Sequence, residues 1–321
     1  MGNKRIYKIY ICLIIIFLAC GLIGVYIRIL INREKVFSPL PDFLTVFANK
    51  EVSTIDIWAP IFEFLENSSN DLPIISAKSA LVYDLTTEKA LFSKNPNDKL
   101  PMASLTKIMT AIIAIESPKK DNKYLVTEGD LVGENSMGLT NNEILSLEEL
   151  LYGLILPSGN DAAETLANNY SGKRRKFIQA MNDKAKSLGL SSTHFANPSG
   201  LEGDGDQFTT VYDLLVITKY AMKFPLFQKI VETVEHGIPY TELHKEFYLY
   251  NETNLLTSYQ GVKGVKTGFT EEAGFCLVTY LDYEGHEIIG IILGSENRRE
   301  EMKELLDYSL KIQGIIPPPH S

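Results

Sequence analysis

The longest apolar run of the chain lies near its start. Lys4, Arg5 and Lys8 precede an almost unbroken run of apolar residues over 9–27. About 20 apolar residues in a row are enough to cross the hydrocarbon core of a bilayer as a helix. This run is long for the apolar part of a cleaved signal peptide, and no clear small-residue cleavage site follows it. We therefore predict a single membrane anchor within residues 1–32, with the rest of the chain outside the cytoplasm.

Residues 33–75 show no regular period. Several prolines and the polar run at 67–71 interrupt short apolar stretches there. Prolines and polar clusters break helices and strands, so we interpret this segment as a spacer with short helical pieces.

The pattern from residue 76 onward predicts strands at both ends of a domain and helices in its middle. Alternating or continuous apolar stretches bounded by turn residues predict strands, and apolar positions three or four residues apart predict helices. The predicted strands are 80–85, 90–93, 264–269, 275–283 and 287–293. The predicted helices are 100–115, 147–156, 161–170, 176–188, 210–223 and 298–312. This order predicts an α+β fold over residues 76–316, in which an antiparallel sheet assembled from distant segments is covered by helices.

The predicted helix 100–115 carries a serine and a lysine three residues apart, Ser104 and Lys107. Residues at this spacing lie on one face of a helix. The rest of the helix is too apolar for solvent, so it is expected in the core. Burial and the positive end of the helix both disfavour an ammonium group. A neutral lysine beside a serine hydroxyl can act as the base that activates a nucleophile.

This spacing is a weak signal by itself, because serine and lysine are both common. Ser117 and Lys120 repeat it in a polar loop that contains a proline. The assignment to Ser104 therefore depends on other parts of the chain.

A second motif, Ser158-Gly159-Asn160, lies between the predicted helices 147–156 and 161–170. Side chains at such a junction can project into a cleft. Ser158 is equally well interpreted as the N-cap of the following helix.

A third motif, Lys266-Thr267-Gly268, lies on the predicted strand 264–269. A lysine and a hydroxyl together suit a carboxylate ligand, and a glycine on a strand lets another backbone approach closely. The alternative interpretation is a lysine at a sheet edge beside a turn.

Composition excludes several other classes of function. The chain has 321 residues and a net charge of −9, which argues against a nucleic-acid partner because such binding neutralises phosphates. The five histidines lack metal-ligand spacing and no glycine-rich phosphate loop occurs in the sequence, so we predict no metal and no cofactor. Cys276 is the one cysteine outside the first apolar run, so no disulfide is predicted in the domain.

In this order and context, the three motifs resemble those of the serine D-alanyl-D-alanine carboxypeptidases, the low-molecular-mass penicillin-binding proteins. The similarity also covers residues 82–95, 150–164 and 193–201, and it extends from about Ser76 to the C-terminal helix. It implies a β-lactamase/DD-peptidase-like fold with a helical subdomain. It also implies a hydrolase of peptidoglycan synthesis and cell shape. Together with the predicted anchor, we expect a protein held in the bacterial cell membrane by one span, with the catalytic domain outside the cytoplasm.

The resemblance implies a catalytic role for three side chains. Ser104 would form the acyl-enzyme, Lys107 would be its base, and Ser158 would pass a proton to the leaving D-alanine. The backbone N–H groups of Ser104 and Phe269 would form the oxyanion hole, which is commonly the largest single catalytic contribution.

The remaining motif residues would bind the substrate, a peptidoglycan stem peptide ending in D-Ala-D-Ala. Asn160 would hold the peptide, and Lys266 and Thr267 would bind its terminal carboxylate, with Gly268 and Phe269 beside them. Penicillin and other β-lactam antibiotics would acylate the same serine.

Two alternatives use the same motifs. Class A serine β-lactamases share the scaffold, but they need a glutamate about 35 residues after their Ser-x-Asn element to deacylate the drug through a water. This chain has residues 194–197 there, with no acid. A membrane-tethered β-lactam-binding protein without turnover would need a cytoplasmic output domain, and only about eight residues precede the apolar run.

Overall fold

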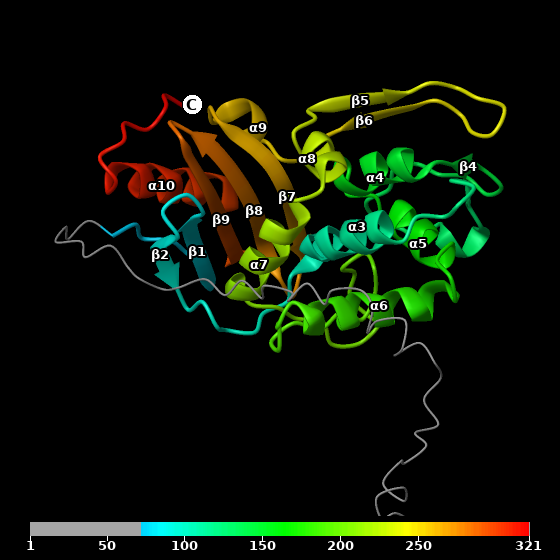
Figure 1. Cartoon of the computed structure of the whole chain (residues 1–321), viewed down its shortest axis with the longest axis horizontal. Helices are drawn as coiled ribbons and strands as arrows, with labels where there is room; N and C mark the ends of the chain where they lie inside the picture. Colours follow the sequence, from blue (N-terminus) through cyan, green and yellow to red (C-terminus); the bar gives the residue numbers. More distant parts are fainter. Residues whose placement is uncertain (1–71, 321) are drawn as a thin grey trace, which may run out of the picture. The chain divides into compact units, whose positions relative to one another are not determined.

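The computed structural model describes residues 72–320 (Figure 1). The predicted anchor and nearly all of the predicted spacer lie outside the described residues. Within 72–320, no helix is both long enough and apolar enough to cross a membrane. The described part has a central antiparallel sheet with helices on both faces, so the predicted α+β architecture is confirmed.

The central sheet has five strands in the order β2-β1-β9-β8-β7, and every neighbouring pair is antiparallel. The strands are β1 Ser79–Asp84, β2 Lys89–Lys94, β7 Val262–Thr270, β8 Gly274–Tyr283 and β9 His286–Ser295. The first hairpin and the last three strands come from opposite ends of the domain, and β1 joins them by pairing with β9. This topology leaves β7 at the edge that faces the helical part of the molecule (Figure 1).

Successive residues of the sheet belong to two different apolar layers, because strand side chains alternate between faces. In β1, Leu81 and Tyr83 lie in one layer, whereas Ala80 and Val82 lie in the other. The helix α10, Arg298–Lys311, covers the second layer with its apolar side. Both faces of the sheet are therefore dry, which explains why the strands are nearly continuous apolar runs.

The other face of the sheet carries the helical part, in which α3 packs against several neighbours (Figure 1). The helices are α3 Thr106–Glu116, α4 Leu147–Ile155, α5 Asn160–Asn168, α6 Lys173–Ser187, α7 Val211–Ala221 and α8 Pro225–Val231. Every residue from Thr106 to Ala114 is buried. The prediction that this helix belongs to the core is confirmed.

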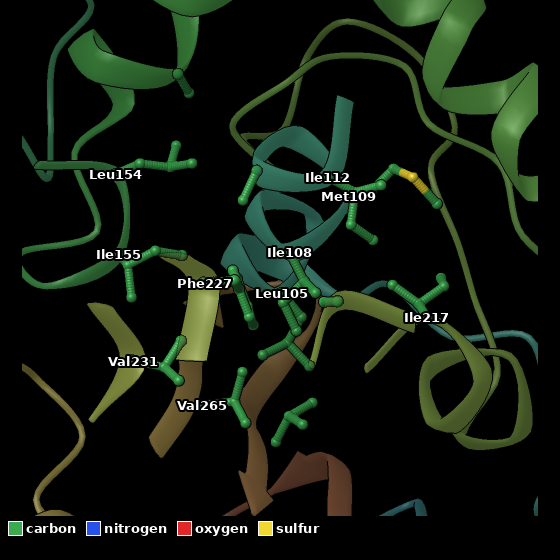
Figure 2. Close-up of a cluster of buried hydrophobic side chains, with 14 of the residues drawn as sticks. Leu105, Ile108, Met109, Ile112, Leu154, Ile155, Ile217, Phe227, Val231 and Val265 are labelled. Carbon is green, nitrogen blue, oxygen red and sulfur yellow. The ribbon is translucent and has the colours of Figure 1, made fainter. Parts of the chain in front are cut away.

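One apolar cluster holds α3 against the edge of the sheet. Figure 2 shows Ile108 and Ile112 of α3 grouped with Ile155 of α4, Ile217 of α7 and Val265 of β7. Burying one such side chain contributes about 1.5–3 kcal/mol. The position of the N-terminal end of α3 relative to β7 is therefore set by packing on several sides.

The start of the helix predicted over 100–115 differs from the prediction. Leu100 pairs with Thr209 in an isolated β-bridge, and a 3-10 turn, η1 Ala103–Leu105, precedes α3. Ala103 has a φ of +48°, a left-handed value that a regular helix cannot contain. The serine motif therefore begins in a sharp turn and not inside a helix.

The prediction also missed several short elements. They are η2 Glu128–Asp130, α8, α9 Leu255–Ser258, and two two-stranded antiparallel sheets, β3 Tyr124–Leu125 with β4 Ile144–Leu145 and β5 Glu235–Ile238 with β6 Phe247–Tyr250. Each has seven residues or fewer, too few for a clear helical or strand period.

Candidate active site

Ser104 lies in η1, directly before the buried helix α3. Lys107 follows in the first turn of α3, and its Nζ lies 2.8 Å from the Ser104 Oγ. The left-handed backbone of Ala103 is costly for a residue with a side chain, and it turns the chain sharply just before the serine. The Ser104 side chain lines a pocket, whereas Lys107 is fully buried.

The Lys107 amine has three close partners. Its Nζ lies 2.7 Å from the Asn160 Oδ1, 2.7 Å from the Ser199 carbonyl oxygen and 2.8 Å from the Ser104 hydroxyl. The amide and carbonyl oxygens can only accept hydrogen bonds, but a hydroxyl can also donate one. A neutral amine would therefore donate to Asn160 and Ser199 and still offer its lone pair to the Ser104 hydroxyl.

The surroundings of Lys107 favour this neutral form. Burial lowers the pKa of Lys107 well below its usual value, and the nearby charge of Lys266 lowers it further. The carboxylates of Glu252, Asp161 and Glu164 oppose this shift with smaller effects. Desolvation is the largest cause because an ammonium group loses its hydration in the interior.

Ser158 lies between α4 and α5, in a strained backbone conformation with a φ of +61°. Gly159, not Ser158, is the N-cap residue of α5, and no side chain caps this helix. The interpretation of Ser158 as an N-cap is therefore wrong. Its side chain lines the pocket, and its Oγ is buried without a hydrogen-bond partner in the described part of the chain. Such a group calls for a partner that a ligand can provide.

The third motif lies on β7, the strand at the sheet edge. Lys266 does lie on an edge strand, as the alternative interpretation had it, but it is only 1% exposed and therefore does not face solvent. Burial lowers the pKa of Lys266 to about 8, and the opposing effect of Glu252 and the further lowering by Arg298 are smaller. The ammonium form still predominates at neutral pH because neutral pH lies below this pKa.

Gly268 lets β7 approach the turn that carries Ser104. A Cβ at this position would lie 3.1 Å from the Ser104 backbone nitrogen and 3.2 Å from the Met102 carbonyl oxygen. Nearly all real Cβ contacts are longer, so a side chain would push the strand away from the turn. The glycine therefore keeps the backbone of β7 next to the Ser104 N–H group.

These elements enclose a pocket of about 260 Å³. It is lined by Ser104, Glu134, Asn135, Ser158, Asn160, Gly200, Leu201, Glu252, Thr267, Gly268, Phe269, Thr270 and Arg298. Six of the eight residues predicted for the site therefore line one pocket. Lys107, buried behind Ser104, and Lys266, buried in the same strand as Thr267, complete the set.

The sequence reasoning missed three contributors to this site. The Ser199 carbonyl accepts a hydrogen bond from Lys107, the Glu252 carboxylate accepts one from the Thr267 hydroxyl, and Arg298 Nη1 donates to the Gly268 carbonyl at 2.6 Å. Every residue has a backbone carbonyl, so the sequence cannot show which residue acts through it. Residues 193–201 did stand out as part of the family resemblance, which was the available signal for Ser199.

The loop around Ser199 is held by a buried asparagine. The Asn197 Oδ1 accepts from the Gly200 N–H at 2.7 Å, and its Nδ2 donates to the Leu201 carbonyl at 2.7 Å. A Cβ on Gly200 would lie 2.0 Å from the Ala103 carbonyl oxygen. The loop therefore packs directly on the nucleophile turn, and an amide stands where the class A β-lactamase pattern led us to look for an acid.

The chain is similar in sequence to known proteins. A family model described as D-alanyl-D-alanine carboxypeptidase, peptidase S11, matches residues 66–297. The D-alanyl-D-alanine carboxypeptidase DacF of Bacillus subtilis (strain 168) is 34% identical over 242 residues, which are 73% of this chain and 62% of that protein. The D-alanyl-D-alanine carboxypeptidase of Streptomyces sp. (strain K15) is 33% identical over 260 residues, which are 75% of this chain and 89% of that protein.

Solved structures share the fold as well. The crystal structure of the Streptomyces K15 DD-transpeptidase matches with a TM-score of 0.70 at 31% identity, and the match covers 75% of this chain and 99% of that one. The chain thus spans less than two thirds of the Bacillus subtilis relative but nearly the whole of the Streptomyces structure. The chain belongs to the D-alanyl-D-alanine carboxypeptidase family and has the DD-peptidase, or penicillin-binding, fold.

Proposed function

We propose that the protein removes the terminal D-alanine from peptidoglycan stem peptides through an acyl-enzyme on Ser104, and that penicillin inhibits it by acylating the same serine. The observation that carries this proposal is the 2.8 Å contact between the Ser104 hydroxyl and a fully buried lysine. Membership of the family supports the same substrate class.

The first half of the reaction forms an ester. The Ser104 oxygen attacks the carbonyl carbon between the two D-alanines, and its proton passes to the neutral Lys107 amine. The negative charge that develops on the carbonyl oxygen is held by the N–H groups of Ser104 and Phe269. The C–N bond then breaks, the leaving nitrogen takes a proton from the Ser158 hydroxyl, Ser158 takes the proton held by Lys107, and free D-alanine departs.

The second half regenerates the enzyme. A water molecule attacks the ester carbonyl and gives a proton to the neutral Lys107 amine; the bond between the carbonyl carbon and the Ser104 oxygen then breaks, and the Ser104 oxygen takes that proton from Lys107 as the shortened peptide leaves. Asn160 serves two purposes in this scheme, because its Oδ1 accepts from Lys107 at 2.7 Å while its side chain lines the pocket beside the peptide.

Lys266 and Thr267 are proposed to bind the terminal carboxylate of the substrate. A peptide amide that ends in D-Ala-D-Ala should therefore be cleaved more slowly than the free acid. A charge-assisted hydrogen bond of this kind contributes roughly 1.5–3 kcal/mol, which corresponds to about ten- to a hundredfold in rate when the bond is fully made in the transition state. Comparing kcat/KM for the two peptides measures the effect, and equal values would remove both residues from the carboxylate site.

The pH dependence of this discrimination follows from the charge of Lys266. Its ammonium form is present below the pKa of about 8 and is lost above it. The preference for the acid peptide should therefore shrink as the pH rises through about 8, while the amide peptide shows no matching loss.

The same assay separates this proposal from the β-lactamase alternative. Penicillin should acylate Ser104 and remain bound. Asn197 holds residues 197–201, where a class A β-lactamase would have an acid that activates the deacylating water, and the retained drug ring blocks the approach that a departed D-alanine opens. The acid peptide should turn over many times. Rapid, repeated hydrolysis of penicillin by the purified protein would favour a β-lactamase instead.

We also propose that residues 9–27 hold the protein in the bacterial cell membrane as a single span, with the catalytic domain outside the cytoplasm. The length of the apolar run supports this. Protease added to intact protoplasts should then remove the catalytic domain. A mature N-terminus after residue 27 would show a cleaved signal peptide, and a lipid on Cys20 would show a lipoprotein.

A further inference from the structure

Glu252 places a carboxylate inside the pocket next to the proposed carboxylate-binding residues. It follows β6 and precedes α9, and its backbone N–H donates to the Leu156 carbonyl at 3.1 Å, which fixes it beside the end of α4. Its side chain lines the same pocket as Ser104 and Thr267. None of the proposed reaction steps uses this carboxylate.

The Glu252 carboxylate spans the pocket between two walls. Its Oε2 accepts from the Thr267 hydroxyl of β7 at 3.4 Å, and its Oε1 accepts from Asn135 Nδ2 at 3.0 Å. The contact with Asn135 is an ordinary hydrogen bond, whereas the contact with Thr267 is long and weak. A ligand can therefore take over the Thr267 hydroxyl without displacing Glu252 from its second partner.

A substrate carboxylate bound at Lys266 and Thr267 would then lie close to a second carboxylate. Two like charges that compete for the Thr267 hydroxyl and both act on the Lys266 charge repel each other, and water screens part of this repulsion because Glu252 is exposed. A leaving residue without a free carboxylate would bind beside Glu252 without this repulsion. The charge on Glu252 thus acts only on substrates that are themselves charged at this point.

We propose that Glu252 determines specificity by weakening recognition of the terminal carboxylate, which reduces the enzyme's preference for a free-acid leaving residue over one that is amidated or extended by a further bond. This inference rests on the proposed function and names the substrate class of the same site. It assigns Glu252 a specificity role, while the bond-making and bond-breaking steps stay with Ser104, Lys107 and Ser158.

The test uses the full-length protein in detergent and the variant Glu252→Gln. Glutamine has the same shape, can still accept from Asn135 and can hydrogen-bond Thr267, but it carries no charge. Measured near pH 6, where Lys266 is protonated, Glu252→Gln should raise the ratio of kcat/KM for acid and amide peptides about tenfold. The gain should come from the acid peptide, and the amide should change less than about twofold.

A matched control is Glu246→Gln, which removes the same charge from the exposed loop between β5 and β6, where Glu246 accepts from the Tyr248 hydroxyl. This variant should leave the acid-to-amide ratio unchanged. A rise as large as that of Glu252→Gln would assign the effect to net charge and overturn the proposal. An unchanged or lower ratio in Glu252→Gln would also overturn it, because a purely structural role through Asn135 changes both peptides equally.

A second pair of probes separates this inference from the function on which it rests. Penicillin and its methyl ester differ only in the free carboxylate, and Glu252→Gln should raise the ratio of their acylation rates in the same direction as the peptide ratio. Normal acylation of Ser104 with unchanged ratios would overturn the role of Glu252 alone. If the wild-type protein reacts with none of the four probes, the proposed function fails and the role of Glu252 fails with it.

Discussion

Penicillin is expected to add covalently to the peptide that contains Ser104, and Ser104→Ala is expected to abolish both this adduct and the cleavage of D-Ala-D-Ala peptides. Ser104 is the hydroxyl nearest the buried lysine, at 2.8 Å, and it lines the pocket. Removal of a catalytic serine commonly lowers the rate by about 10⁴-fold or more, because no other group can form the acyl-enzyme. Mass spectrometry of the digested protein locates the adduct.

The chain contains its own control for this experiment. Ser117 and Lys120 have the same spacing, but both are exposed, and Ser117 lies just after the end of α3. Ser117→Ala should therefore leave the labelling unchanged. An adduct that persists in Ser104→Ala, or that maps to Ser117, would contradict the assignment of the nucleophile. The unfolding temperature should change little in Ser104→Ala, because one partly exposed hydroxyl contributes little to stability.

Local pattern was enough to predict the regular elements of this fold. The apolar runs of α3, α4, β8 and β9 are long, each forms the predicted helix or strand, and α3 is buried as predicted. The local pattern could not predict the order of strands in the sheet, because the pairing of β1 with β9 joins residues about 200 positions apart. The sheet of β5 and β6 was missed because its strands have four residues each and β5 contains Gly237.

In the candidate site, too, contacts between residues close in sequence could be predicted, whereas contacts between distant residues could not. The Ser104–Lys107 contact is local, so helical spacing alone brought the two residues together. The contact of Lys107 with Asn160 is not local, because the two residues are 53 positions apart. Only the family resemblance brought these motifs into one site before the structure did.

The residues that were missed share a physical reason. Glu252 and Arg298 are charged residues of a kind that usually faces solvent, and nothing in their neighbours distinguishes them from surface charges. What places them in the pocket is the end of β6 and the start of α10, two positions set by tertiary packing. The buried Oγ of Ser158 was likewise invisible, because its backbone conformation removes it from the capping position that its sequence suggests.

Lys107→Arg is expected to lower the rate of acylation by penicillin about 10²–10⁴-fold, the usual contribution of a general base. Arginine keeps the positive charge but cannot give up its proton at any useful pH. If the lysine acted as a cation, arginine would preserve much of the activity. If it acts as a neutral base, as its lowered pKa suggests, the activity should be lost.

The variant must be shown to fold, because Lys107 is fully buried and the guanidinium group is larger. Lys107→Met provides a second variant that fits an apolar site more easily and also lacks the base. The unfolding temperature and near-ultraviolet circular dichroism of both variants test the fold. Lys120→Arg, in the exposed copy of the motif, should acylate like the wild type.

The pH profile of the wild-type protein gives an independent measurement of the same base. The neutral form of Lys107 exists above its pKa, and burial places that pKa well below the ordinary lysine value of 10.5. Acylation should therefore persist far below that value and fall as acid protonates the amine. Acylation that needs a pH near 10.5, or a folded Lys107→Arg variant that reacts at nearly the wild-type rate, would show that another group takes the proton from Ser104.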